Sequence, residues 1–445
     1  MNNEEIRSAF PITKVMLKPN KDGISRKLVY LDHAASTHPP KQVLDIYLQI
    51  MQNTYANVHR GEHELSEIST EMFEEVPQIV SKFLGINNLE NSGKQVVFSS
   101  NTTSSLDMAS HLFSNQDGIT LTSVIEHHSN DLPHRRRGKT IHYTMNDDGT
   151  INMDDLENKL SNNKVKLVAI TGGSNVTGFM PDIHKVARLA HDHDAKILVD
   201  AAQRLAHYPI DVKPLDHPEH LDFVAAAGHK TYAPFGSSFL LGTSEIFDNA
   251  PPYIPSGGTV SFVTEDDIVF LKGTDRHTYG TPNIAGTIAF GKSIQFLSEI
   301  GMDYIRDHEL HLLKRLLKGM KELSNVEIYG DFPLNQKLGV VTFNINGMRH
   351  NHVSQLLNEY SGIATRNGCF CAHPYIARLL KVSDIDATKL KDAIINGENP
   401  ELPGAVRASI GLYNNEEEID LLIETLSTII NNPKNTKNSV TVSVN

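Results

Sequence analysis

Short apolar runs alternate with amphipathic segments through the middle of the chain. Several runs are apolar at every position, as in strands that are buried on both faces. The predicted strands are residues 94–98, 119–125, 165–171, 196–199, 223–226 and 238–241. Residues 181–194 carry apolar side chains at helical spacing, with Pro181 near the start. Strands that alternate with helices predict an α/β fold, with a mainly parallel sheet covered by helices on both faces.

The pattern changes in the last third of the chain. Residues 304–323 predict a helix, and residues 326–329 and 339–345 predict strands. A last helix carries one apolar stripe, with Asn415 as its cap and Glu418 in the reciprocal capping position. We therefore predict an N-terminal segment that packs with a small domain, a large domain, a small α+β domain and a polar tail. Their boundaries are 1–37, 38–290, 291–432 and 433–445.

Composition places the chain among ordinary globular proteins, with 39% hydrophobic and 21% charged residues. A net charge of −12 is opposite in sign to a nucleic-acid-binding surface, so we expect no nucleic-acid partner. Two cysteines exclude a disulfide framework and fit a reducing compartment. The N-terminus lacks a signal-peptide pattern and no apolar run is long enough to span a bilayer. We expect a cytoplasmic protein without membrane association.

Polar segments directly follow several of the predicted strands, where ligand sites of open α/β sheets gather. Residues 99–105 are rich in Ser and Thr, which indicates either a phosphate cradle at a helix start or an ordinary helix cap. Residues 126–128 contain two adjacent histidines. These form either a polar loop or a place where one ring stacks on a planar ligand or moves protons. Neighbouring side chains of an extended chain point apart, so one metal ion rarely takes both.

An aspartate and a lysine also end apolar strands. Asp200 requires a cationic partner, either a structural Arg or a protonated heterocyclic nitrogen. Lys230 either extends its ammonium to solvent or has a pKa lowered by burial, which suits covalent chemistry with carbonyl groups. His191 and His193, at a predicted helix end, are interpreted as solvent-exposed. No spacing of His, Asp and Glu indicates a metal site.

In this order the segments resemble the class V aminotransferase family of pyridoxal phosphate (PLP) enzymes, most of all its cysteine desulfurase and selenocysteine lyase branch. Blocks between residues 28 and 430 carry the resemblance. Among them are residues 30–37 (YLDHAAST), 57–61 (NVHRG), 174–178 (SNVTG), 280–283 (GTPN), 366–374 (RNGCFCAHP) and 406–409 (VRAS). The resemblance implies fold type I of the PLP-dependent transferases, with a mainly parallel seven-stranded sheet and a smaller α+β domain.

The resemblance also implies a role for each matching residue. Lys230 would carry the cofactor covalently and move protons, Asp200 would pair with its pyridinium nitrogen, and Cys371 would take up sulfur. The implied catalytic residues are Lys230, Cys371 and His127. The implied cofactor-binding residues are Thr102, Thr103, His127, Asn175, Asp200, Gln203, His229, Lys230 and, reaching the site of a second subunit, Thr281. The implied substrate-binding residues are Arg407, Arg366, Asn175, His59 and Arg60.

The implied reaction removes sulfur from L-cysteine, or selenium from L-selenocysteine, and leaves L-alanine and a Cys persulfide. The alternatives are another class V enzyme (an aminotransferase, an epimerase or a C–S lyase) acting on a different amino substrate, and a non-catalytic partner protein. Lys230 and Asp200 argue against the last of these. The expected partners are an amino-acid substrate, a second copy of the chain in a homodimer with shared active sites, and a sulfur-acceptor protein.

Three features depart from the family pattern. Ala227 stands where many members have a Ser, and His33 replaces an Asn. An insert at 383–403, with a predicted helix at 387–395, lengthens the stretch between Cys371 and the last shared block. The insert is placed to cover the site, to alter substrate choice or to draw Cys371 away. Cys369 has no counterpart in the family and is either a spare thiol or a packing residue.

Overall fold

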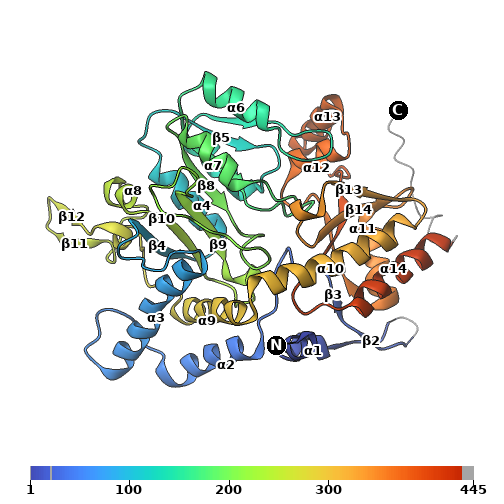
Figure 1. The fold of residues 1–445 in the computed structure, drawn as a ribbon, viewed down its shortest axis with the longest axis horizontal. Helices are drawn as coiled ribbons and strands as arrows, with labels where there is room; N and C mark the ends of the chain where they lie inside the picture. The colour runs from blue at the N-terminus through green and yellow to red at the C-terminus, as the bar shows by residue number, and fades with distance from the viewer. Residues whose placement is uncertain (1, 21–22, 433–445) are drawn as a thin grey trace.

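The structure of the chain is a computed structural model that describes residues 2–20 and 23–432 (Figure 1). The tail predicted at 433–445 lies outside the described residues. A central sheet of seven strands has the order β4-β10-β9-β8-β7-β5-β6, and β10 is antiparallel to both of its neighbours. The strands are β4 (Lys94–Ser99), β5 (Ile119–Ser123), β6 (Thr140–Tyr143), β7 (Val165–Thr171), β8 (Lys196–Asp200), β9 (Phe223–Ala227) and β10 (Ser238–Thr243). The predicted α/β fold with a mainly parallel sheet is confirmed.

Alternate side chains of the sheet enter two apolar layers, because successive residues of a strand point to opposite faces. In β8, Ile197 and Val199 enter one layer, and Leu198 enters the other. The first layer contains α3 (Glu64–Phe83), α6 (Met153–Asn162), α7 (Ile183–His191) and α9 (Ile284–Ile300). The second contains α4 (Thr102–Leu112) and α8 (Ser244–Asn249). Coverage on both faces explains why the strand segments are apolar throughout.

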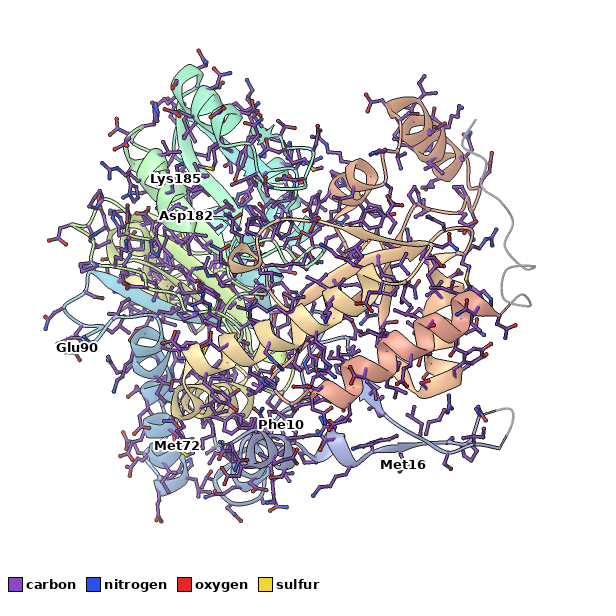
Figure 2. All side chains as sticks on the ribbon, turned by 45° about the vertical axis from the view of Figure 1, so that its right-hand side comes forward. Phe10, Met16, Met72, Glu90, Asp182 and Lys185 are labelled. Atoms are coloured by element: carbon purple, nitrogen blue, oxygen red, sulfur yellow. The ribbon has the colours of Figure 1, made fainter. Side chains whose placement is uncertain are left out.

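Helix α7 is shorter than the 181–194 prediction. Asp182 accepts the Lys185 N–H at 3.0 Å and caps the helix, so Pro181 lies before the helix rather than in it. Figure 2 shows the Asp182 and Lys185 side chains at the start of α7. The predicted apolar stripe is buried against the sheet, and the helix ends at His191. This end places His191 near the start of β8, on the sheet edge opposite the strand ends that carry Asp200.

A second, antiparallel sheet lies on the right of Figure 1. Its order is β13-β14-β17-β16, with β13 (Val326–Tyr329), β14 (Val340–Ile345), β17 (Ala405–Ser409) and β16 (Arg366–Gly368). It shares an apolar core with α10 (Met302–Lys321), α11 (His350–Ser361) and α14 (Glu416–Asn431). Near the N-terminus, β3 (Val29–Tyr30) pairs with β15 (Ile363–Ala364) beside this core. The predicted smaller α+β part of the fold is therefore present.

The start of α14 differs from the prediction in one detail. Asn415 accepts the Glu418 N–H at 3.1 Å as predicted, but the Glu418 carboxylate does not return to the Asn415 backbone. It accepts from Asn414 Nδ2 at 2.7 Å and pairs with Arg7 of α1 (Asn3–Ser8). Glu418 thus joins the two ends of the described chain instead of closing a capping box.

The remaining elements connect these layers. They include α2 (Lys41–Gln49), α5 (Leu132–Arg137), α12 (His373–Leu379), α13 (Asp384–Ile395), β1 (Met16–Leu17), β2 (Arg26–Lys27), β11 (Val260–Val263) and β12 (Ile268–Phe270). Across residues 2–20 and 23–432, no helix has both the length and the apolar character needed to cross a membrane.

Candidate active site

A cavity of about 360 Å³ opens at the carboxyl ends of the parallel strands. Asp200 ends β8, Lys230 lies just beyond β9, and α4 begins at the cavity wall. Most of the predicted site residues line this cavity, although their sequence positions span more than half of the chain. Those residues are Thr102, Thr103, His127, Asn175, Asp200, Gln203, His229, Lys230, Arg366, Cys371 and Arg407.

Three predicted residues lie outside the cavity of this chain. Thr281, His59 and Arg60 are exposed. His59 Nδ1 lies 3.3 Å from a Glu74 carboxylate oxygen, and Arg60 Nη2 donates to the Gly257 carbonyl at 3.2 Å. The role of Thr281 at the site of a second subunit and the roles of His59 and Arg60 in substrate binding stay predictions.

Lys230 and Asp200 face the cavity as a pair of perturbed titratable groups. The pKa of Lys230 is lowered to about 8, mainly by burial and in smaller part by the nearby Arg407, against the opposing effect of Asp200. Burial likewise raises the pKa of Asp200. The Asp200 carboxylate accepts the Ala202 N–H at 3.0 Å, and no Arg forms an ion pair with it among the described residues. Of the two partners considered for Asp200, the structural Arg is absent among the described residues. The position beside the Asp200 carboxylate can therefore take a cationic nitrogen of a ligand.

The start of α4 forms an anion-binding corner of the cavity. Asn101 caps the helix by accepting the Ser104 N–H at 3.0 Å. Thr102 Oγ1 and His229 Nδ1 are buried and have no hydrogen-bond partner in the described chain. The Thr103 and Ser129 hydroxyls lie 2.7 Å apart in the same wall. Unpartnered polar atoms at a helix N-terminus suit a phosphate group, so the residues present fit the phosphate of PLP.

His127 presents a neutral ring to the cavity. Burial lowers its pKa to about 4, and the charge of Lys230 adds to the effect. His127 Nδ1 accepts the Ser129 N–H at 3.1 Å, so the single proton of the neutral ring is on Nε2. An uncharged aromatic ring in the wall is suited to stacking on a planar ligand.

Two arginines of the cavity wall meet through Asp32. Arg407 is buried and donates from Nη2 to Asp32 at 3.1 Å, and Arg366 Nη2 lies 2.9 Å from the other Asp32 oxygen. Arg407 Nη1 also donates to the Asn175 carbonyl at 2.9 Å. Asp32 lies in the 30–37 block but was not predicted as a site residue. Asp32 holds both guanidinium groups at the cavity, where they can bind a substrate carboxylate.

Cys371 lies on an exposed loop at the cavity mouth. Its thiol is free, and both Cys371 and Phe370 have left-handed backbone conformations, with φ of 54° and 55°. Such conformations in non-glycine residues persist only where surrounding contacts hold them. Here the Cys371 carbonyl accepts the His128 N–H at 2.8 Å, and the His373 N–H donates to the His128 ring at 3.2 Å.

The insert leaves this arrangement intact. No residue of 383–403 lines the cavity, and Cys371 remains in its wall. The insert therefore neither covers the cavity nor draws the thiol away in this structure. Cys369 is partly buried, carries a free thiol and does not line the cavity.

Comparison with known proteins identifies the class to which this fold and site belong. The aminotransferase class-V family model matches residues 29–422, so the chain belongs to this family of enzymes. The probable cysteine desulfurase of Synechocystis sp. is 32% identical over 437 residues, which cover 96% of this chain and 95% of that protein. The cysteine desulfurase of Escherichia coli O8 is 32% identical over 96% of this chain and 98% of its own.

Solved structures agree with the sequence relatives. The apo structure of the cysteine desulfurase from Thermococcus onnurineus NA1 superposes with a TM-score of 0.81 at 30% identity, covering 96% of this chain and 98% of that one. The cysteine desulfurase CsdA (S-sulfonic acid) from Escherichia coli gives a TM-score of 0.78 at 25% identity, with the same coverage. These neighbours confirm the predicted PLP-dependent transferase fold.

Proposed function

We propose that the chain is a PLP-dependent cysteine desulfurase that converts L-cysteine to L-alanine and retains the sulfur as a persulfide on Cys371. One observation carries this proposal. A single cavity combines Lys230 and Asp200 at its base, the buried Arg407 in its wall and the accessible Cys371 thiol at its mouth. Relatives named as cysteine desulfurases cover nearly the whole chain, which supports this reaction over other class V activities.

The cavity has a suitable residue for each part of PLP. Thr102 and His229 would hold the phosphate, because their buried polar atoms have no other partners among the residues that the structure describes. His127 would lie against the ring, and Asp200 would pair with the pyridine nitrogen, whose positive charge favours ionised Asp200. Gln203 would face the phenolic oxygen. Bound PLP supplies an electron sink for bonds at the substrate α- and β-carbons.

The chain's own residues then place the substrate and move its protons. The Arg407 guanidinium would bind the substrate carboxylate through a forked pair of hydrogen bonds, beside Asn175 and Arg366. With a pKa of about 8, Lys230 Nζ is near the operating range of a general base and can take and return a proton at the α-carbon.

Cys371 would carry out the sulfur transfer. Its Sγ forms a bond to the substrate sulfur while the substrate Cβ–S bond breaks. The carbon keeps the electron pair and takes a proton, so the products are alanine and a Cys371 persulfide. An exposed loop position would let a sulfur-acceptor protein reach this persulfide. The proposed reaction needs a reduced Cys371 thiol, and both cysteines are free. We therefore propose a reducing, cytoplasmic location.

We further infer that two copies of the chain share their active sites. Thr281, His59 and Arg60 match site residues of the family, yet they lie on the exposed surface of this chain. A homodimer in which each chain presents these residues to the site of its partner would satisfy both facts.

The proposal is tested by measuring alanine and sulfide released from L-cysteine in the presence of a thiol reductant. We expect Cys371→Ala to lose persulfide formation and keep the cofactor absorbance of the wild type. Cys369→Ala is the matched control and should retain turnover, because Cys369 does not line the cavity. Wild-type sulfur release by Cys371→Ala would exclude Cys371 as the acceptor. Cofactor binding without any cysteine turnover would instead assign the chain to another class V activity.

A further inference from the structure

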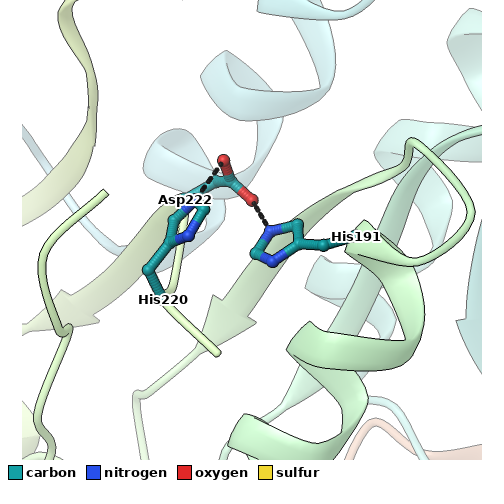
Figure 3. Close-up of side chains that lie close together, drawn as sticks. All are labelled: His191, His220 and Asp222. Carbon is teal, nitrogen blue, oxygen red and sulfur yellow. Dashed lines mark hydrogen bonds and ion pairs between the residues drawn. The ribbon is translucent and has the colours of Figure 1, made fainter. Parts of the chain in front are cut away.

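A second group of titratable side chains lies at the opposite end of the central sheet. His191 ends α7, while His220 and Asp222 come just before β9 (Figure 3). Strand β8 begins at Lys196 beside this group and ends at Asp200 in the cavity, so about 13 Å of strand separates the two places. The interpretation of His191 as solvent-exposed is wrong, since its side chain is only 16% exposed. The fold brings α7 against the segment before β9, which the sequence spacing did not indicate.

Three potential ligand atoms converge here. His191 Nε2 lies 2.8 Å from Asp222 Oδ2, and His220 Nε2 lies 3.2 Å from Asp222 Oδ1. The two imidazole rings stack with centroids 4.2 Å apart and planes 20° apart. One atom from each residue can be chosen so that all three lie within 4.8 Å of one another. The Asp222 carboxylate is fully buried.

The hydrogen bonds of the two rings fix where their protons lie. His191 Nδ1 faces the Pro218 carbonyl at 2.9 Å, and His220 Nδ1 faces the His217 carbonyl at 2.7 Å. A carbonyl oxygen can only accept, so each Nδ1 carries a proton. A neutral imidazole has one proton, and each Nε2 would then direct a lone pair at the Asp222 carboxylate, which also only accepts. A favourable contact between either Nε2 and Asp222 therefore requires that ring to be an imidazolium ion, or a cation to lie between the ring and the carboxylate.

The surroundings favour a metal cation over two imidazolium ions. Two stacked imidazolium rings would place like charges 4.2 Å apart next to a single carboxylate. Lys196 lies 3.0 Å from that carboxylate, so its ammonium has to turn away from any second cation that binds there. A divalent ion would replace the two Nε2 protons of the imidazolium rings without changing the total charge. It would accept the lone pairs of both Nε2 atoms and of the Asp222 carboxylate.

We propose that His191, His220 and Asp222 bind one divalent transition-metal ion, with zinc as the ion that suits two imidazoles and a carboxylate. Metal-ligating histidines usually donate their other ring N–H to a backbone carbonyl or carboxylate, as both rings do here. The Ile197 N–H, which donates to Asp222 Oδ2 at 3.0 Å, would orient the carboxylate. Lys196 is 42% exposed and can turn its ammonium into water when the ion binds.

Such an ion would tie the end of α7 to the segment that leads into β9, at the end of the sheet opposite Asp200 and Lys230. A fourth coordination position would be left to water, because the three residues supply three ligands. The site is separate from the cavity and does not depend on the proposed reaction.

The test uses the full-length enzyme loaded with its cofactor, without a histidine tag, after dialysis against a chelator. Titration calorimetry with Zn²⁺ should show one tight equivalent, with a heat that depends on the buffer if protons are released. His220→Gln should weaken zinc binding by at least about 100-fold. Losing only a hydrogen-bond partner of a metal ligand already weakens binding by up to about 100-fold, and this variant loses a ligand itself. His191→Gln should act in the same way.

Two controls separate this site from other metal-binding groups. His193→Gln changes a neighbouring histidine that is not a ligand, and Cys371→Ser removes the thiol beside His128 and His373. Both should keep the wild-type zinc affinity. X-ray absorption of the wild-type zinc complex should show two imidazole ligands and no sulfur, which decides the question even if a ligand variant misfolds. Absence of a tight equivalent, sulfur ligation, or unchanged affinity in folded His220→Gln would overturn the metal site and assign the cluster to an ion pair with protonated rings.

Discussion

Glu126, next to His127 in the chain, is buried, and its titration bears on stability. Burial raises its pKa to about 8 from an ordinary 4.5, despite hydrogen bonds from Ser123 and Asn130. Between these two values the unfolded chain loses a proton that the folded chain keeps, so this group lowers the free energy of unfolding as pH rises. We expect Glu126→Gln to remove that loss. Relative to the wild type, its free energy of unfolding should rise by a few kcal/mol between about pH 4.5 and 8.

Urea unfolding at the two ends of this pH range measures the effect. Glu90→Gln is the matched control, because it makes the same change at an exposed position (Figure 2). Surface changes of this kind alter stability by less than about 0.5 kcal/mol. If the stability difference between Glu126→Gln and wild type were the same at both pH values, Glu126 would not be protonated in the folded enzyme.

The residues that could be predicted from sequence are those whose signal is local. Lys230 and Asp200 stand out because a charged side chain directly follows an apolar strand, and the cavity contains both. Asp32 and His220 could not be assigned in this way. The contacts of Asp32 with Arg407 and of His220 with His191 join positions that only the folded chain brings together.

Helices and strands, too, could be predicted only where their local sequence pattern is strong. Strand β7 was predicted with its observed bounds, because its apolar run is long and buried on both faces. Strand β6 was missed. It has four residues, lies at the edge of the sheet and is mostly half-buried, so its pattern does not differ from that of a loop.

Helix α13 is an element that the fold does not need. None of its residues is buried, and Ile385, Ile394 and Ile395 are exposed. Replacing residues 384–395 with a short Gly-Ser linker should change the free energy of unfolding by less than about 1 kcal/mol, because little apolar surface is lost from the core. Basal turnover of L-cysteine should also be kept. Chemical unfolding and alanine release check both expectations, and a large loss of stability would show that the insert packs more closely than the structure indicates.

Helix α1 joins α14 through a buried ion pair, so removing the pair should lower the free energy of unfolding. Arg7 donates to the Tyr413 carbonyl and pairs with Glu418 at the start of α14. Arg7→Ala leaves the Glu418 charge with Asn414 as its remaining side-chain partner, and such changes cost about 3–5 kcal/mol. Lys41→Ala is the control, because the exposed Lys41–Asp45 pair should contribute at most about 0.5 kcal/mol. Equal effects of the two variants in urea unfolding would contradict a stabilising contact between the chain ends.

At the scale of the molecule, the sequence pattern predicted the fold class because strands and helices alternate over the first two thirds of the chain. It could not place Thr281, whose proposed role crosses a subunit boundary. Thr281 resembles a cofactor-binding residue in sequence, yet it is exposed and outside the cavity of its own chain. In the homodimer that we propose, a second copy of the chain would bring Thr281 to the site.

Shared sites make a quantitative prediction for mixed dimers. Lys230→Ala inactivates the site of its own chain, and Thr281→Asp should inactivate the partner site by repelling the cofactor phosphate. A dimer with one chain of each kind then has one intact site, built from the Lys230 of one chain and the Thr281 of the other. Random pairing of equal amounts makes half of the dimers mixed, so co-expression should restore about a quarter of wild-type activity to two variants that are each inactive alone.

Co-expression with two different affinity tags and tandem purification isolates the mixed dimer, which should retain about half of wild-type activity. The control pairs Lys230→Ala with Asp200→Ala, because both residues lie in the same chain's cavity. That mixed dimer has no intact site and should stay inactive. Activity restored by the first pair and not by the second requires Thr281 to act on the neighbouring chain. If the first pair also stays inactive while both chains bind each other, Thr281 serves its own chain and the sites are not shared.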